Sequence, residues 1–481
     1  MRVLTDDTDL EELSSDAGML RLRPRAAWVA ESEQDVADAL ARAEVLGETI
    51  TPRGGGTAIP SQSVGRGVVL LQDRRRAAMS DDGTVACQPG MVKADLNDLL
   101  GSSGKWMPVD PSSYRSCTVG GMTSNNSSGI RTAKYGSTID HVTGLRVVTP
   151  GSQVVEVGAV PVQTALSSDP RTRKVAELLL DNERSIREER PPVTKNSSGY
   201  RLERVLHDGL FDMRKLFVGS EGTLGVVTEV AFQTSARPES RLLLVVEAEL
   251  GELGQTVSEF RRLGPSAVEL VDKTVFRQVG RERMVAPYSR GTGDYLVFSE
   301  FDGSESQVQE KAEEVASSPV AKYEPLAFTG AAEVARAWEV RNETLNVAQE
   351  MRDGTKVLVP GVEDLVVPPD RLADLVSLLR TQFEKRGLTY ISYGHAADAN
   401  LHARPLLDPG SPRDRRLLEE LMEDCFEAVW RMKGSMTGEH GDGMLRAKFV
   451  ERQYPKTYHV MKEVKRLFDP KGMLNPGVKV A

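Results

Sequence analysis

The residues best suited to chemistry lie late in the chain, where three of its six histidines fall between positions 395 and 440. His395 and His402 flank a short polar segment in GHAADANLH, and Glu439 precedes His440 in GEHGDG. Two imidazoles and one carboxylate form a ligand set for a first-row divalent metal that leaves positions open for a substrate. The adjacent pair permits a division of labour, with Glu439 on the metal and His440 as general base.

A structural role is the better interpretation for any single histidine, and we assign it to His141, His207 and His459. The other three differ because they are grouped. His395 and His402 lie between two extended runs, 388–393 and 401–406. A loop joining two adjacent strands places both imidazoles at one end of a sheet, which favours a common site.

Three glycine-rich segments in the first half predict close approach of a ligand to the backbone. They are PRGGGT (52–57), TVGGMTSNNSSG (118–129) and the β-type run VGSEGTLGVV (218–227). Consecutive glycines alone are as compatible with a mobile turn as with an anion site, and polar loops are often only loops. Their occurrence together in one half of the chain favours a large flat ligand.

Arg341 is the candidate cation for an anionic substrate, since a guanidinium can bind a carboxylate in bidentate fashion. It lies late in a predicted helix, 332–349. The alternative is an exposed salt bridge with Glu339 or Glu343 on the same helix.

The elements that must position these residues follow two patterns. A βαβ opening is predicted by a strand at 28–30, a helix from Ser32 to about Leu46 with Ser32 and Asp35 as capping box and Gly47 as stop, and a strand at 48–52. Strands at 67–71 and 84–88, a helix at 93–100, and a hairpin of 145–149 with 153–157 around Pro150 and Gly151 complete this half.

The pattern changes near residues 235–238, where we place a domain boundary. Strands at 241–247, 267–271, 294–300 and 323–328, with helices at 255–263 and 307–316, give the ferredoxin-like βαββαβ order. A strand at 357–359 and a helix at 369–385 follow.

Composition narrows the class of protein. The chain has 481 residues and a net charge of −9, which argues against a nucleic-acid footprint. No apolar stretch approaches the ~20 residues of a membrane span, and the acidic start lacks the features of a secretory signal, so we expect a cytoplasmic protein. The three cysteines, Cys87, Cys117 and Cys425, are expected to be small buried residues.

Six motifs in order resemble the FAD-linked oxidase family of vanillyl-alcohol oxidase and p-cresol methylhydroxylase, in the branch of the D-lactate, glycolate and D-2-hydroxyglutarate dehydrogenases. The resemblance extends from about Arg25 to Val478. Its motifs are PRGGGT, TVGGMTSNNSSG with KYGSTIDHV, GSEGTLGVVTE, GHAADANLH, GEHGDG and FDPKGMLNPG.

The resemblance implies an α+β fold with a two-part FAD-binding domain (1–235), a ferredoxin-like substrate or cap domain with an antiparallel sheet and the metal site (236–445), and a C-terminal segment that returns to the FAD domain (446–481). It implies non-covalent FAD, because covalent members often carry a histidine where Thr57 stands. The implied FAD-binding residues are Arg53, Gly54, Gly55, Gly56, Thr57, Pro111, Thr118, Gly120, Gly121, Ser124, Asn125, Ser128, Gly222, Gly225, Val227 and Asn475.

It also implies a divalent metal, zinc first and manganese or iron next, on His395, His402 and Glu439. His440 is then the catalytic base and Arg341 the catalytic and substrate-binding cation, while Lys356 and Asn400 match weaker substrate-contact positions. Two departures stand out. Residues 58–64 read AIPSQSV in place of a glycine-rich turn, and Ala397 replaces a loop glycine, where a left-handed backbone would cost about 1 kcal/mol.

The implied activity is oxidation of a D-2-hydroxy acid to the 2-oxo acid, with hydride transfer to flavin N5. Three cysteines are too few for an ordinary iron–sulfur cluster, so the expected electron acceptor is a separate iron–sulfur protein or an electron-transfer flavoprotein. Two alternatives stay open: an oxygen-using oxidase of an alcohol or sugar, and an electron-transfer subunit without substrate chemistry. We expect at most peripheral membrane association, and a homodimer is compatible with the sequence.

Overall fold

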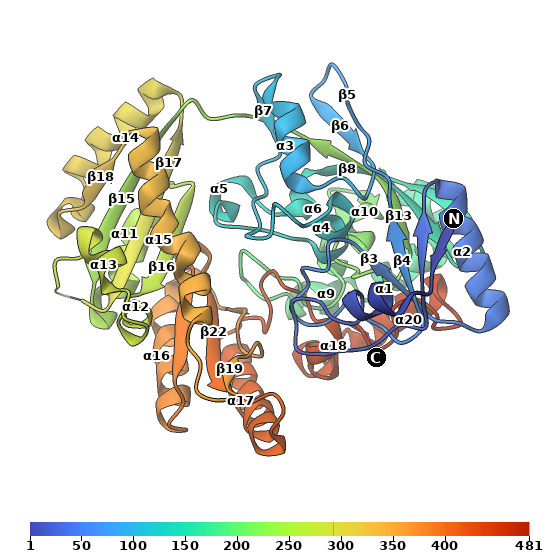
Figure 1. The fold of residues 1–481 in the computed structure, drawn as a ribbon. Helices are drawn as coiled ribbons and strands as arrows, with labels where there is room; N and C mark the ends of the chain where they lie inside the picture. The colour runs from blue at the N-terminus through green and yellow to red at the C-terminus, as the bar shows by residue number, and fades with distance from the viewer. Residues whose placement is uncertain (292, 481) are drawn as a thin grey trace.

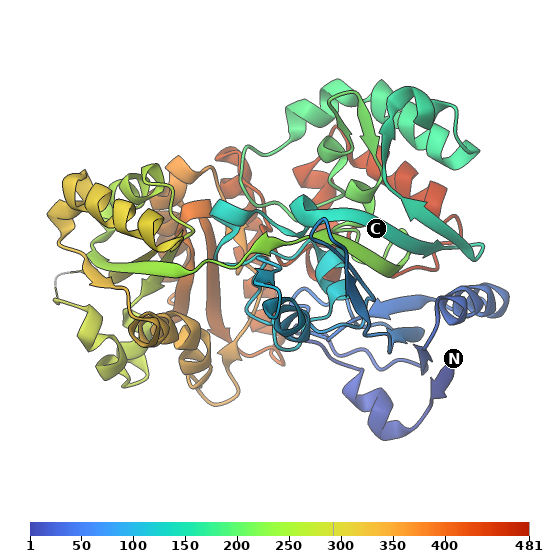
Figure 2. The ribbon, with the colours of Figure 1, turned by 90° about the horizontal axis from the view of Figure 1, so that it is seen from above.

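The computed structural model describes residues 1–291 and 293–480, which form two lobes (Figure 1). One lobe contains the first half of the chain and the last segment, and the other contains the yellow and orange segments between them. The view from above shows the same division, with the C-terminal helices beside the N-terminal half (Figure 2). Helix α20 (Tyr458–Phe468) packs on α8 (Pro170–Asp181), which joins the C-terminal segment to the first half of the chain.

The first sheet of the N-terminal lobe is the predicted βαβ opening. Its order is β1-β2-β4-β3, with β2, β4 and β3 parallel. The connecting helix α2 (Glu33–Leu46) begins at a capping box of Ser32 and Asp35 and ends at Gly47, whose φ is 66°. Both predicted helix signals are therefore confirmed. The strands are β1 (Arg2–Leu4), β2 (Ala26–Ala30), β3 (Ile50–Arg53) and β4 (Val68–Gln72).

The second sheet has the order β5-β6-β13-β8-β9 and is antiparallel. Its hairpin of β8 with β9 is the predicted one, and Gly151 and Ser152 take left-handed φ values of 83° and 58° in the connection. The prediction that residues 218–227 form a β-type run was wrong for most of its length. Only β13 from Val226 is a strand, because three left-handed residues, Gly219, Glu221 and Gly222, turn the preceding chain into a loop.

The bounds of the remaining elements of this lobe follow. Its strands are β5 (Ala77–Met79), β6 (Thr84–Cys87), β7 (Lys105–Trp106), β8 (Val142–Thr149), β9 (Gln153–Val157), β10 (Ala159–Pro161), β11 (Leu206–His207), β12 (Leu210–Asp212), β13 (Val226–Gln233) and β14 (Ser235–Ala236). Its helices include α1 (Asp7–Glu12), α3 (Lys93–Gly101), α4 (Val119–Asn125), α5 (Thr132–Tyr135), α6 (Thr138–His141), α7 (Val162–Leu166), α9 (Glu183–Glu189), α10 (Arg214–Phe217), α18 (Gly443–Arg446) and α19 (Val450–Gln453).

The second lobe is built on an antiparallel sheet whose first four strands have the order β18-β15-β17-β16. This is the ferredoxin-like order predicted from the βαββαβ pattern. Strands β21 and β22 extend the same sheet beyond β16, which places the late histidines next to the ferredoxin-like unit. The strands are β15 (Ser240–Ala248), β16 (Ala267–Asp272), β17 (Tyr295–Gly303), β18 (Leu326–Phe328), β19 (Val357–Leu358), β20 (Leu365–Val366), β21 (Tyr390–His395) and β22 (Asn400–Leu407).

Amphipathic helices cover this sheet, and helix α11 packs against both α16 and strands β15–β17. The helices are α11 (Leu250–Arg262), α12 (Thr274–Gln278), α13 (Glu282–Val285), α14 (Glu305–Ser317), α15 (Ala331–Gln349), α16 (Leu372–Glu384) and α17 (Pro412–Arg431). Helix α17, which the sequence patterns above did not single out, contains Arg413, Arg415 and Arg416 in its first turns.

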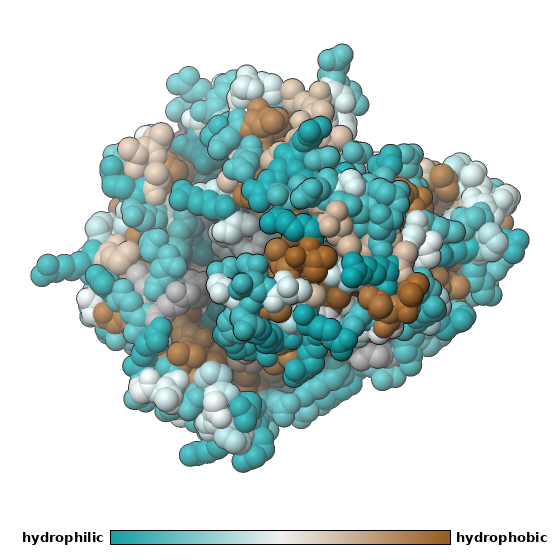
Figure 3. Space-filling view, turned by 45° about the vertical axis from the view of Figure 1, so that its right-hand side comes forward, coloured by the Kyte–Doolittle hydropathy of each residue, from teal (hydrophilic) through white to brown (hydrophobic). Residues whose placement is uncertain are grey.

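The surface and the cysteines agree with the compositional predictions. Figure 3 shows a face covered mostly by hydrophilic side chains, with small separate apolar patches. Within the described residues, no helix combines the length and the apolar character that a membrane span requires. Cys87, Cys117 and Cys425 are buried and unpaired, as expected, and burial raises the pKa of Cys87 and Cys425 to about 12.

Candidate functional site

A cavity of about 520 Å³ runs along the N-terminal lobe and is lined by all three glycine-rich segments. This volume is in the range of cofactor and ligand pockets. Every residue implied to bind FAD lines it except Asn475: Arg53, Gly54, Gly55, Gly56, Thr57, Pro111, Thr118, Gly120, Gly121, Ser124, Asn125, Ser128, Gly222, Gly225 and Val227. Asn475 instead donates from Nδ2 to the carbonyls of Gln62 and Glu221, two residues that do line the cavity.

The glycines of the first segment are needed for close packing. A Cβ on Gly55 would lie 2.0 Å from the carbonyl oxygen of Ser116, and one on Gly54 would lie 2.4 Å from Oγ1 of Thr118. Both distances are far inside van der Waals contact. The PRGGGT loop therefore lies directly against the start of the second segment, where Thr118 caps α4. Residues 58–64, where a further glycine-rich turn was expected, still contribute Ala58, Ile59, Gln62 and Ser63 to the cavity wall.

The late histidines meet at the end of the β21–β22 hairpin. Tyr393 pairs with His402 and His395 pairs with Asn400, so both imidazoles lie at the same end of the sheet, as the sequence predicted. Their Nε2 atoms are 3.2 Å apart. Oε1 of Glu439 lies 3.1 Å from Nε2 of His395 and 3.3 Å from Nε2 of His402. The structure thus brings the three predicted metal ligands together through one atom each.

The remaining ring nitrogens fix the orientation of these imidazoles. Nδ1 of His395 lies 2.7 Å from Oε1 of Glu269, and Nδ1 of His402 lies 2.7 Å from the carbonyl oxygen of Glu363. Each acceptor calls for a proton on Nδ1, so the neutral form of each imidazole has its lone pair on Nε2, which faces the cluster. This is the arrangement of metal-binding histidines, so the donor set fits a divalent ion.

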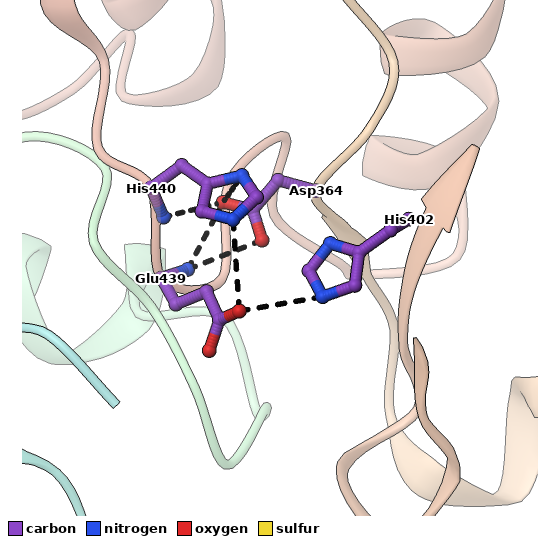
Figure 4. Close-up of side chains that lie close together, drawn as sticks. All are labelled: Asp364, His402, Glu439 and His440. Carbon is purple, nitrogen blue, oxygen red and sulfur yellow. Dashed lines mark hydrogen bonds and ion pairs between the residues drawn. The ribbon is translucent and has the colours of Figure 1, made fainter. Parts of the chain in front are cut away.

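Asp364 is an alternative ligand that sequence reasoning missed. It forms a close group with His402, Glu439 and His440, whose possible ligand atoms all lie within 4.8 Å of one another (Figure 4). However, Oδ2 of Asp364 accepts from the backbone N–H groups of Glu439 at 3.0 Å and His440 at 2.8 Å. Oδ1 accepts from Asn400 at 3.0 Å. Asp364 is therefore occupied in shaping the loop, whereas Nε2 of His395 faces Glu439 and His402 and is available to a metal ion.

Lys195 is the second residue that the sequence did not reveal. Its Nζ lies 3.0 Å from Oε2 of Glu439, and Ser128 donates to the same oxygen at 2.7 Å. Lys195 is 2% exposed and stands in a loop with no motif spacing to mark it. Burial opposes ionisation of Glu439, but Lys195 and His395 outweigh it and hold the pKa of that carboxyl well below its usual range.

The electrostatics of the imidazoles are set by carboxylates. Burial lowers the pKa of His395, yet Glu269 and Glu439 raise it to about 9. A metal ion at this site must therefore displace a proton, which makes metal binding stronger as the pH rises. Burial depresses the pKa of His402, in agreement with a neutral ligand.

His440 lines the cavity beside Glu439, and its side chain is 18% exposed. Its Nε2 lies 3.6 Å from Oε1 of Glu439, and its Nδ1 lies 3.5 Å from Oε1 of Glu363. Burial lowers the pKa of His440, but Asp364 and Glu363 overcome this and raise it. Glu363 is in turn held by an ion pair with the buried Arg446.

Arg341 and the two weaker substrate positions have separate surroundings. Arg341, 7% exposed, donates from Nε to Oε2 of Glu269 at 2.7 Å and lies over the ring of Tyr393. Its ion-pair partner is thus Glu269 rather than Glu339 or Glu343 on its own helix. Asn400 is buried against Asp364. Lys356 is not brought into the cluster, because it lies by the opposite end of β22 and pairs with Asp353.

The backbone of GHAADANLH differs from the expectation for Ala397. Ala397 lies in a short 3-10 turn, η5 (Ala396–Asp398), without a left-handed φ, and it is Ala399 that adopts φ 50°. The left-handed backbone expected at position 397 therefore occurs two residues later, at Ala399. The three histidines expected to be structural lie outside the cluster: His141 bonds the carbonyl of Tyr135, His207 lies near Asp208 and Asp212, and His459 is exposed.

Comparison with known proteins identifies the family. Residues 24–158 match the FAD binding domain, and residues 237–478 match the C-terminal domain of FAD linked oxidases. The chain belongs to the FAD-linked oxidase family. Its first half thus includes an FAD-binding domain that contains most of the cavity-lining residues, and its second half contains the histidine cluster.

Relatives and solved structures agree with this assignment. The chain is 28% identical over 98% of its length to a D-2-hydroxyglutarate dehydrogenase of Escherichia coli, of which it spans only 50%. It is 27% identical over 89% of its length to a glycolate oxidase subunit of Bacillus subtilis, of which it spans 83%. Among solved structures, p-cresol methylhydroxylase superimposes with a TM-score of 0.72 over 99% of this chain and 93% of that one, at 14% identity. The predicted α+β fold with two FAD-oxidase domains is therefore confirmed.

Proposed function

We propose that this protein is an FAD-dependent dehydrogenase that oxidises a D-2-hydroxy acid of the lactate, glycolate or 2-hydroxyglutarate class to its 2-oxo acid. One observation supports this above all others: Glu439 and His440 line the same cavity as the glycine-rich segments. The histidine cluster and the cofactor site are therefore neighbours, which the chemistry requires. The names of the relatives add support, although the first of them is twice as long as the region it shares with this chain.

The chain divides, in this proposal, into an FAD-binding domain (1–235), a substrate domain with the metal site (236–445) and a C-terminal segment (446–481). Residues 53–57 would hold the pyrophosphate of a non-covalent FAD, and 118–128 and 222–227 would lie along the rest of it. When bound, FAD supplies the acceptor for the hydride from C2 of the substrate. Arg53 brings positive charge to this end of the cavity.

His395, His402 and Glu439 would hold a divalent metal, with zinc as the first candidate. When bound, the ion supplies positive charge beside the substrate hydroxyl, which is worth several kcal/mol as negative charge develops there. Lys195 and Ser128 keep the second oxygen of Glu439 occupied, so the carboxylate offers one oxygen to the imidazoles.

His440 is the proposed base. Nε2 of its imidazole takes the hydroxyl proton of the substrate, while C2 loses its hydrogen with the electron pair, which leaves the 2-oxo acid. Asp364 and Glu363 stabilise the resulting imidazolium, since both carboxylates favour the protonated ring. Arg341 is the proposed cation for the substrate carboxylate, held in position by Glu269.

The electrons leave, in this proposal, to a separate iron–sulfur protein or electron-transfer flavoprotein in the cytoplasm. The three cysteines are buried and far apart in sequence, and none is placed for a cluster. The word subunit in the name of the Bacillus subtilis relative agrees with a separate partner.

Anaerobic titration of the purified protein with a panel of D- and L-2-hydroxy acids tests the proposal. The flavin absorbance should bleach with D-2-hydroxy acids without an added partner, and metal analysis of the same sample should find about one divalent ion per chain. Colourless protein, or a flavin that no hydroxy acid reduces, would refute the proposal. Chelation should remove metal and flavin reduction together, and full reduction without metal would reject the metal role. Peroxide release in air would instead favour an oxidase.

A further inference from the structure

Strand β22 directs two polar side chains to the same face of the sheet, His402 and Arg404. Alternate residues of a strand share a face and lie about 6.6–6.8 Å apart along it. His402 reaches toward Glu439 and His440 from this strand (Figure 4). Arg404 is 9% exposed, and its Nε is buried without a hydrogen-bond partner. Nothing in the described part of the chain forms a hydrogen bond or ion pair with its guanidinium.

The nearby carboxylates are already used by other groups. The positive charge of Arg404 is close enough to help lower the pKa of Glu363. However, Glu363 forms its ion pair with Arg446 and accepts a hydrogen bond from the backbone N–H of Gly361. Glu269 is shared by Arg341 and His395. Arg404 is therefore a buried cation beside the candidate site. Among the described residues, no carboxylate forms an ion pair with it.

A purely structural role for Arg404 has little support in its surroundings. The cation over the ring of Tyr393 is Arg341, at 5.0 Å, so that stacking position is taken. Buried charges are otherwise paired, because desolvation of an unpaired guanidinium is costly. An arginine held without a partner next to a site is therefore suited to an anion that arrives with the ligand.

We propose that Arg404 binds a second carboxylate of the substrate, so that the site selects a dicarboxylic 2-hydroxy acid over a monocarboxylic one. The inference rests on the proposed function and specifies its substrate class. Arg341 receives the carboxylate next to the hydroxyl, and Arg404, one strand repeat beyond His402, receives the distal one. The spacing of His402 and Arg404 along β22, about 6.6–6.8 Å, suits a chain of four or five carbons between the metal site and the distal carboxylate.

Kinetics of Arg404→Met, with Arg404→Lys and the exposed control Arg431→Met, test the assignment. The measured quantity is the ratio of kcat/KM for D-2-hydroxyglutarate to kcat/KM for D-lactate. Both values are obtained from the loss of flavin absorbance as the flavin is reduced. A lost charge-assisted hydrogen bond corresponds to a fall of about ten- to a hundred-fold in this ratio for Arg404→Met. Arg404→Lys, which keeps the charge without the planar fork, should fall in between, and Arg431→Met should match wild type. An unchanged ratio, or equal losses on both acids, would overturn the proposal.

Calorimetric binding separates this inference from the proposed function and does not depend on turnover. Glutarate should bind the wild-type holoenzyme more tightly than butyrate, and Arg404→Lys should weaken glutarate binding while Arg431→Met does not. If no hydroxy acid reduces the flavin but this pattern holds, the proposed function fails and the role of Arg404 stands. If glutarate binds no better than butyrate, or as well to Arg404→Lys as to wild type, the role of Arg404 is refuted. The lysine variant also decides the question if Arg404→Met does not fold.

Discussion

Nζ of Lys195 lies 3.0 Å from Oε2 of Glu439, while Oε1 of the same carboxylate lies 3.1 Å from Nε2 of His395. The two oxygens of Glu439 thus have different partners. One accepts from Lys195 and Ser128 of the N-terminal lobe, and the other faces the imidazoles of the β21–β22 hairpin. Lys195 therefore determines which oxygen is available to a metal.

Replacement of Lys195 by methionine should weaken metal binding. Loss of a residue that orients a ligand typically lowers metal affinity about 10- to 100-fold. Competition of the FAD-loaded protein with a chromophoric chelator measures this affinity directly. Lys448→Met is the matched control, because this side chain is 54% exposed in the turn between α18 and α19. Equal metal affinity in Lys195→Met and wild type would show that Glu439 needs no such support.

His440→Ala should slow flavin reduction by the substrate about 10²- to 10⁴-fold, the usual contribution of a positioned base. The cofactor should stay bound, because His440 is only one of many residues that line the cavity. Rapid-mixing absorbance measurements at saturating D-2-hydroxy acid give the rate. His459→Ala, at an exposed histidine, is the control. A rate equal to that of wild type would remove His440 from the proton-transfer step.

Sequence patterns predicted those parts of the site in which the residues belong to one segment of regular secondary structure. His395 and His402 could be placed together because a strand–loop–strand segment has one geometry, and the capping box at Ser32 and Asp35 fixed the start of α2. The order of strands β18-β15-β17-β16 followed from the βαββαβ pattern.

The contacts that cross between distant segments could not be predicted in this way. Lys195 reaches Glu439 across 244 residues of sequence, and Arg341 reaches Glu269 across 72. No periodicity relates such residues. The first pair depends on how the two lobes pack, and the second depends on how α15 packs against β16 within the second lobe. Ala399 was missed for a local reason: the left-handed position depends on the turn that precedes it, which the residue types alone did not determine.

Stability should depend on pH through Lys93, which is 1% exposed at the start of α3. Burial lowers its pKa to about 8 from 10.5, with Asp110 acting in the opposite sense. As the pH rises, Lys93 therefore loses its proton at a lower pH in the folded state than in the unfolded state. Burial of the protonated Lys93 therefore lowers the free energy of unfolding by about 3 kcal/mol below pH 8. This cost disappears as the pH rises toward 10.5.

Lys93→Met should therefore raise the free energy of unfolding at neutral pH, and its advantage over wild type should shrink between about pH 8 and 10.5. Urea denaturation of the FAD-loaded proteins at several pH values measures this difference. Lys471→Met, at a side chain that is 61% exposed, should show no such trend. A constant difference across this range would mean that Lys93 is protonated to the same extent in the folded and unfolded states.

Gly55→Ala should impair FAD binding. The added methyl group would lie 2.0 Å from the carbonyl oxygen of Ser116, so the PRGGGT loop must move away from the segment that it contacts. Because both segments line the cavity, such a shift changes the shape of the site where the pyrophosphate is proposed to bind. The ratio of flavin to protein after purification, and the affinity of the stripped protein for added FAD, both measure the effect. Gly158→Ala is the matched control, since a Cβ there meets no atom within 4 Å and the backbone is not left-handed. If Gly55→Ala retains FAD as well as Gly158→Ala does, close packing of these two loops is not what shapes the cofactor site.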